Sequence, residues 1–169
     1  MVTEKNNEQD YQKSSISVLG KALINGFFGG IFWSIIGVVM YYFNFAEIAP
    51  KTFLLRSWTK AQWTTGWLGE VVSIFMVGVL SILVAVIYYG LFKKINSMWI
   101  GVVYGLIVWG IVFYILEPIF STVPELTEFN QDTIVSTICL FILYGLFIGY
   151  SISFDYYEML IRLQQKKKT

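Results

Sequence analysis

The stretch GFFGGIFWSIIG, residues 26–37, is the most informative part of this sequence, because it carries four glycines and no charge. Each glycine costs a helix about 0.8–1.0 kcal/mol relative to alanine in water. On a helical wheel Gly26, Gly30 and Gly37 nevertheless share one face, and Phe28 points away from it. In lipid such a face lets helices approach closely. The stretch therefore predicts a packed membrane helix.

Four apolar runs, counting this one, have no Asp, Glu, Lys or Arg in their interiors. Each has about the length, roughly 20 residues, that crosses a hydrocarbon core. Lipid offers the backbone no hydrogen-bond partner, so each run is expected to be helical. They lie at 22–43, 71–92, 98–116 and 133–154. The sequence predicts an all-α membrane protein with four transmembrane helices.

Outside these runs the chain is polar. We expect residues 1–20 to form a disordered tail, 21–155 the transmembrane domain, and 156–169 an amphipathic, basic tail that extends the fourth helix. Four crossings place both termini and the second connection on one side, with nine of the twelve basic residues. Cytoplasmic segments carry such an excess. Both termini are therefore expected in the cytoplasm.

Small residues recur on every predicted helix. Gly101 and Gly105 have GxxxG spacing on the third helix, and Gly145 and Gly149 on the fourth. One GxxxG is weak evidence, but four small-residue faces predict a tight bundle, within one chain or between copies. The glycines expected to pack helices are Gly26, Gly30, Gly37, Gly101, Gly105, Gly145 and Gly149.

The first connection is rich in tryptophan. Thr59 and Gln62 have the spacing of a capping box, which predicts a short helix leading into the second crossing. Trp63 and Trp67 would share one face of it. With Trp58 they are expected to anchor this interfacial helix at the outer membrane surface. A lid over a pocket is the functional alternative.

Residues that carry chemistry are scarce. The chain has no histidine and one cysteine, which removes the commonest general base and any thiolate cluster. The predicted crossings hold no ionisable interior residue that could relay protons. We expect no catalytic residue, no metal and no cofactor. Trp33 and Trp109 lie deep in their helices, where each either packs against a neighbouring helix or lines a cavity.

One carboxylate lies at the outer end of each predicted helix. Glu70 and Asp132 are at helix N-termini, where the dipole favours an anion. That explanation fails for Glu47 and Glu117, which are at C-terminal ends. We hypothesise that the four acids converge on one external patch, the alternative being a solvated face. The residues expected to supply counter-ions are Arg56 and Lys60.

Four stretches resemble the YqhR family, small multi-pass membrane proteins of Bacillus-type bacteria. They are YYFNFAEIAP (41–50), GWLGE (66–70), INSMWIGVVYG (95–105) and YGLFIGYSISFDY (144–156). The resemblance covers residues from about 20 to 160 and leaves the tails unmatched. It implies a four-helix protein of the bacterial plasma membrane and assigns no activity to any residue.

These features predict a non-enzymatic membrane protein, a scaffold, assembly or regulatory subunit of another membrane protein. The alternative is an oligomeric channel or carrier for a small solute or lipid, lined by serine and tyrosine hydroxyls. An intramembrane enzyme comes third. The expected partners are the lipid bilayer and either further copies or a larger membrane protein. Nucleic acid is not expected, because the net charge is only +1.

Overall fold

The computed structural model describes residues 2–56, 64, 66–95, 97–115 and 129–168, without the side chains of 2–13, 53, 56 and 166–168. The helical elements are α1 (Val2–Tyr42), η1 (Thr52–Arg56), α2 (Trp67–Phe92), α3 (Met98–Gly110), η3 (Ile111–Ile115) and α4 (Gln131–Lys168). Both η elements are π-helical, and η3 directly continues α3.

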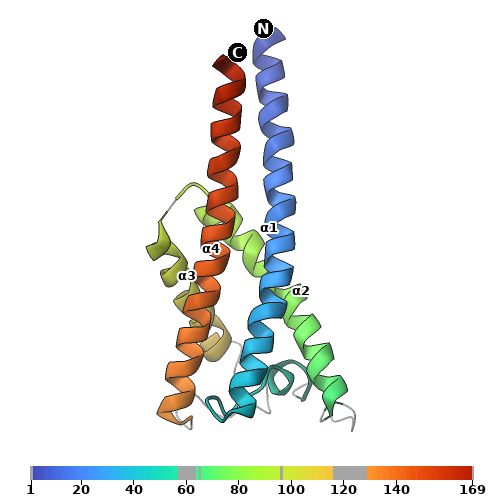
Figure 1. Ribbon diagram of the computed structural model, residues 1–169, viewed down its shortest axis with the longest axis vertical. Coiled ribbons are helices and arrows are strands. Elements are labelled where there is room, and N and C mark those ends of the chain that lie inside the picture. Colours follow the sequence, from blue (N-terminus) through green and yellow to red (C-terminus); the bar gives the residue numbers. More distant parts are fainter. Residues whose placement is uncertain (1, 57–63, 65, 96, 116–128, 169) are drawn as a thin grey trace.

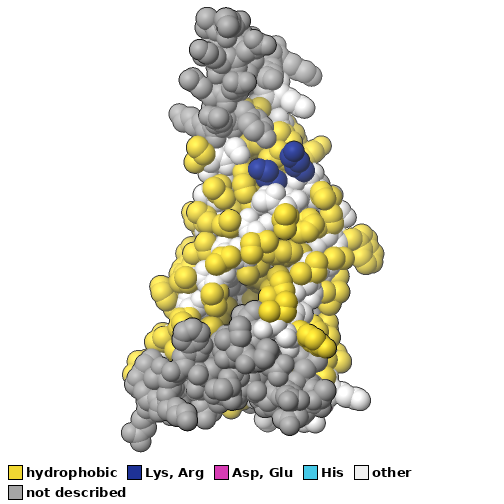
Figure 2. Space-filling model, turned by 180° about the vertical axis from the view of Figure 1, so that it is seen from behind, with side chains coloured by type: hydrophobic (Ala, Val, Ile, Leu, Met, Phe, Trp, Pro, Cys, Tyr) yellow, Lys and Arg dark blue, Asp and Glu magenta, His cyan; other side chains and the backbone are white. Residues whose placement is uncertain are grey.

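Within the described residues, four helices are long and apolar enough to cross a membrane: Ser14–Tyr42, Trp67–Phe92, Met98–Ile115 and Gln131–Gln165. Their large apolar side chains are often exposed; Phe28 is 63% exposed, Leu83 59% and Phe154 54%. Figure 2 shows apolar side chains forming a broad band, with basic side chains near its upper end. The prediction of an all-α chain with four long apolar helices is confirmed.

The helices pack in an order that differs from their order in the chain. α1 contacts both α2 and α4, and α4 contacts α3. α2 and α3 meet close to the short turn that joins them, where the Tyr104 hydroxyl donates to the Val84 carbonyl at 2.6 Å and the Tyr104 ring lies edge-on to Tyr88. Away from this turn α2 and α3 diverge (Figure 1).

Helix α1 ends in a defined cap. Asn44 has φ +59°, the left-handed conformation that asparagine tolerates after a helix. Its N–H donates to the Tyr41 carbonyl at 3.1 Å, and the Phe45 N–H donates to the Met40 carbonyl at 2.9 Å. This pair of bonds is the Schellman motif. It reverses the chain after α1, and the following residues pass next to the start of α4.

Helices α1 and α4 continue side by side beyond the α2–α3 turn, and both termini lie at that end (Figure 1). Here the paired ends of these two helices, residues 14–20 of α1 and 156–165 of α4, are called the stalk; they begin at the level where α2 ends. Val18 is 4% exposed, and Tyr156 and Met159 of α4 are each 6% exposed in the same apolar cluster. The expected disordered tail at 1–20 therefore differs from the structure, in which α1 is helical from Val2. Apolar side chains of α4 bury Val18. The local sequence around Val18 does not reveal these partners, because they lie in a distant part of the chain.

Candidate functional site

A cavity of about 230 Å³ lies among the four helices, in the half of the bundle where α2 and α3 diverge. Each helix contributes to its wall: α1 through Trp33 and Ser34, α2 through Leu80, α3 through Val108 and α4 through Phe141. No described lining residue is charged. The cavity thus offers an apolar volume inside the predicted bilayer.

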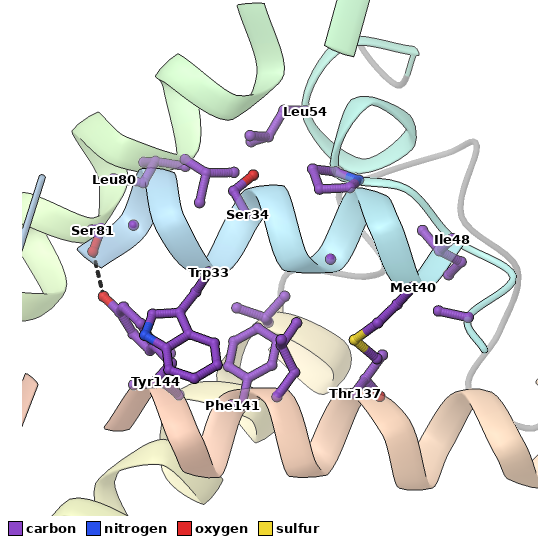
Figure 3. A pocket seen from close by; sticks show the side chains of 18 of the residues that line it. Trp33, Ser34, Met40, Ile48, Leu54, Leu80, Ser81, Thr137, Phe141 and Tyr144 are labelled. Atoms are coloured by element: carbon purple, nitrogen blue, oxygen red, sulfur yellow. Dashed lines mark hydrogen bonds between the residues drawn. The ribbon is translucent and has the colours of Figure 1, made fainter. Parts of the chain in front are cut away.

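Hydroxyl contacts close one end of the cavity. The hydroxyls of Ser81 and Tyr144 lie 2.5 Å apart, which joins α2 to α4 (Figure 3). Val84 and Val108 line the same end, next to the Tyr104 hydrogen bond that holds α2 to α3. The bundle is therefore tightly packed beyond this level.

The α1–α2 connection closes the other end. Ala46, Ile48, Ala49, Pro50 and Leu54 all line the cavity. Ile48 is 8% exposed and belongs to a second apolar cluster with Phe113 and Phe129. The connection thus folds back under the helices as a floor.

Two polar groups in the wall lack partners. The Trp33 Nε1 and the Ser34 Oγ are buried, and neither has a hydrogen-bond partner among the described residues. Ser34 as a whole is only 5% exposed. Figure 3 shows Trp33 pointing from α1 toward Tyr144 and Phe141, whereas Ser34 points toward Leu80 and Leu54. A buried polar group without a partner costs about 1–3 kcal/mol, so each of these two atoms would gain from an added hydrogen-bond partner.

Trp109 has a different environment. Its Nε1 donates to the Thr137 Oγ1 at 3.2 Å, and its ring stacks on Phe113 with centroids 5.4 Å apart. The Thr137 hydroxyl in turn donates to the Thr133 carbonyl at 2.8 Å. Of the two alternatives left open by the sequence, Trp33 lines the cavity and Trp109 packs.

The predicted packing glycines lie where helices come close. A Cβ at Gly26 would be 2.6 Å from the Ala85 Cβ, and one at Gly30 would overlap the Ser81 side chain. Between α3 and α4, a Cβ at Gly105 would overlap the Phe141 carbonyl oxygen. A Cβ would also come too close to backbone atoms of the facing helix at three other predicted positions, Gly101, Gly145 and Gly149.

Gly37 differs from the other six. A Cβ there would lie 3.6 Å from Leu140 and 3.8 Å from Pro50, which are ordinary contacts. The residue lines the cavity, and no α2 atom lies within 4 Å of that Cβ position. A Cβ at Gly110, on the same helix as Gly101 and Gly105, would have no described atom within 4 Å.

Of the predicted acidic rim, Glu47 contacts the start of α4. Its carboxylate accepts hydrogen bonds from the Asn130 side chain at 2.5 Å and the Asn130 backbone N–H at 3.3 Å. Its own N–H donates to the Thr133 Oγ1 at 3.1 Å. An acid that follows the C-terminus of α1 is thus placed at the N-terminus of α4, where the helix dipole favours it.

Glu70 forms an ion pair that the sequence analysis did not identify. The Lys51 Nζ lies 2.6 Å from the Glu70 Oε1, and the two side chains are 13% and 9% exposed. No described donor meets either Glu70 oxygen with hydrogen-bond geometry. The positive charge of Lys51 therefore neutralises the Glu70 carboxylate. Lys51 directly follows Pro50, and the pair holds the cavity floor to the first turn of α2.

The other predicted residues divide into two groups. Asp132 is exposed in the first turn of α4, and Trp67 begins α2 with 72% exposure. Outside the described residues lie Glu117, Lys60, Trp58, Trp63, the Arg56 side chain and the interfacial helix predicted at Thr59. Within the described residues, no group of three His, Cys, Asp or Glu is placed to hold a metal ion.

Comparison with known proteins gives a family. The family model described as "Conserved membrane protein YqhR" matches residues 2–168. A protein of Bacillus subtilis (strain 168), described as "Uncharacterized protein YqhR", is 43% identical over 164 residues, which cover 94% of this chain and 92% of the relative. No solved structure matches the chain. The match includes both tails, which the resemblance in the sequence left out.

Proposed function

The chain belongs to the YqhR family of conserved membrane proteins. We propose that it acts as a non-enzymatic scaffold, assembly or regulatory subunit of another membrane protein. The observation that carries this proposal is the stalk. Ile16, Tyr157 and Ile161 are 70%, 53% and 40% exposed on it. We infer that the stalk extends past the lipid, where exposed apolar side chains are typical of protein contact surfaces.

The stalk is built to be rigid. The Ser15 and Tyr89 hydroxyls lie 2.8 Å apart, which ties α1 to the end of α2. Directly next to the stalk, Lys21 and Asp155 form an ion pair at 2.8 Å across α1 and α4. A preorganised surface loses little conformational entropy on binding, so such a helical pair suits a docking role.

We further propose how the protein sits and packs. The end with both termini is placed in the cytoplasm, because nine of the twelve basic residues belong to that side. The glycine faces hold α1 to α2 and α3 to α4, since a side chain would separate those backbones. The tryptophan-rich connection forms an interfacial helix on the outer surface.

Affinity purification of the tagged full chain from native membranes tests the subunit role. We expect a stoichiometric membrane protein to co-purify, and the variant Tyr157→Ser/Ile161→Ser to lose it. Phe28→Ala, on the lipid-facing side of α1, is the matched control and should retain the partner. Failure to capture a stoichiometric partner, or equal capture by the stalk variant, would refute the subunit role.

A carrier for a lipid is the second candidate, and the cavity is the observation that favours it. The lining is almost entirely apolar, so it suits a lipid better than a small polar solute. Lipid transfer between liposomes that contain only the purified chain would support this candidate. Transfer no faster than in protein-free liposomes would exclude it.

A further inference from the structure

We propose that the cavity is a binding site for a membrane quinone, whose flat ring carries carbonyl groups and an apolar chain. The ring would lie beside Trp33 and Phe141, and one carbonyl would accept a hydrogen bond from the Trp33 Nε1. The inference rests on the same cavity as the proposed lipid-carrier function. A quinone bound there could equally regulate the chain in its role as a subunit of another membrane protein. The inference therefore holds or fails independently of the stalk.

The depth of Trp33 excludes most lipid headgroups. Trp33 is 12 residues after Lys21 and 9 before Tyr42, which is about 18 Å and 13 Å along a helix. A hydrocarbon core is about 30 Å thick, so Trp33 lies near its centre. Charged or zwitterionic headgroups are costly at that depth, and no described lining residue carries a compensating charge. The ligand must be uncharged.

The unpartnered groups specify a hydrogen-bond acceptor. An indole N–H only donates, so the Trp33 Nε1 requires an acceptor such as a carbonyl oxygen. The Ser34 hydroxyl, in a residue only 5% exposed, is also unpartnered but points toward Leu80 and Leu54, away from the proposed ring position.

The size and shape of the site fit a ring. An engineered apolar cavity of about 150 Å³ binds benzene, and this cavity is larger, at about 230 Å³. Figure 3 shows the Trp33 indole and the Phe141 ring on the same side of the cavity. Aromatic rings pack well against flat conjugated rings. A saturated chain alone would leave the Trp33 N–H unpaired.

The test uses the purified full chain in nanodiscs with decylubiquinone as the probe. Bound quinone is measured by its absorbance after gel filtration, with empty nanodiscs subtracted. We expect saturable binding near one quinone per chain. Trp33→Phe should weaken binding about threefold to tenfold, the range for one net hydrogen bond. Trp109→Phe, whose indole bonds to Thr137, should bind as the native chain does.

A cavity-filling variant covers the case in which Trp33→Phe folds poorly. Gly37→Leu places a side chain in the cavity from a position where a Cβ meets only ordinary contacts. It should abolish binding without lowering the melting temperature. Gly110→Leu, at a position open to its surroundings, should leave binding unchanged.

Three results would overturn the proposal. The first is quinone binding no greater than in empty nanodiscs. The second is native-like binding by Gly37→Leu. The third is equal competition by decylbenzene, which lacks carbonyls, because the cavity would then hold any apolar chain. Each result leaves partner capture by the stalk untouched, so the two proposals fail separately.

Discussion

Lys51 and Glu70 illustrate how single residues fix the floor of the cavity. Their side chains are mostly buried and their charges lie 2.6 Å apart. Burying two charges is expensive, and their attraction repays it only while both are present. Removing one partner leaves the other charge buried without compensation, whereas replacing both by apolar residues removes the cost.

We predict that Lys51→Met destabilises the protein by about 3 kcal/mol, the lower end of the range for breaking a buried pair. Lys51→Met/Glu70→Leu should recover most of this loss. Melting curves of the three chains in one detergent would measure the coupling. The exposed pair Arg162 and Glu158 is the control, and Glu158→Gln should cost less than about 1 kcal/mol. A double variant no more stable than Lys51→Met would contradict this account.

At the scale of helices, close backbone contact between α3 and α4 makes a specific prediction. A Cβ at Gly145 would lie 2.5 Å from the Gly105 Cα and N, and backbone cannot move aside as a flexible side chain does. Gly145→Ala should therefore destabilise by about 1–3 kcal/mol, the usual cost of overpacking. The measurement is the melting temperature and oligomer size in detergent.

Glycines that face open space provide the control for this prediction. Gly90→Ala and Gly110→Ala introduce a Cβ that meets nothing within 4 Å. They should be neutral or slightly stabilising, because alanine is the better helix former. Equal destabilisation at Gly145 and Gly110 would show that helix packing is not the reason for these glycines.

The sequence predicted elements better than it predicted their partners. Charge-free runs are enough to locate α2 or α3, because lipid leaves the backbone no alternative to a helix. A helical wheel also grouped Gly37 with Gly26 and Gly30. It could not show that α2 leaves α1 within two turns, so that Gly37 faces a cavity. Packing order is a tertiary property that no single helix encodes.

The same limit applies to the site. That Trp33 lies deep in its helix follows from the sequence, but whether its N–H meets a partner depends on α4. Glu70 was recognised as an acid at the start of a helix, yet its partner Lys51 lies at the far side of a long connection. Local spacing in the sequence does not reveal this ion pair, because only the tertiary fold brings the two residues together.

For the molecule as a whole, the two ends of the bundle differ in a way that implies an orientation. The termini, the stalk and the α2–α3 turn lie toward one end, and the α1–α2 connection and the start of α4 lie at the other (Figure 1). The stalk end holds Lys93 and Lys94 in its turn and further basic residues on both tails. Multi-pass proteins retain such basic segments in the cytoplasm.

We predict that the stalk is cytoplasmic and the start of α4 is external, and single cysteines can show it. The native Cys139 is first replaced by serine, and Ser97→Cys or Gln131→Cys is then added; both positions are exposed at opposite ends of the bundle. A membrane-impermeant maleimide applied to intact cells should label Gln131→Cys alone, because only that thiol faces the outside. After permeabilisation both should react, which controls for accessibility. Labelling of Ser97→Cys in intact cells would reverse the orientation and place the stalk, with any partner it binds, outside the cell.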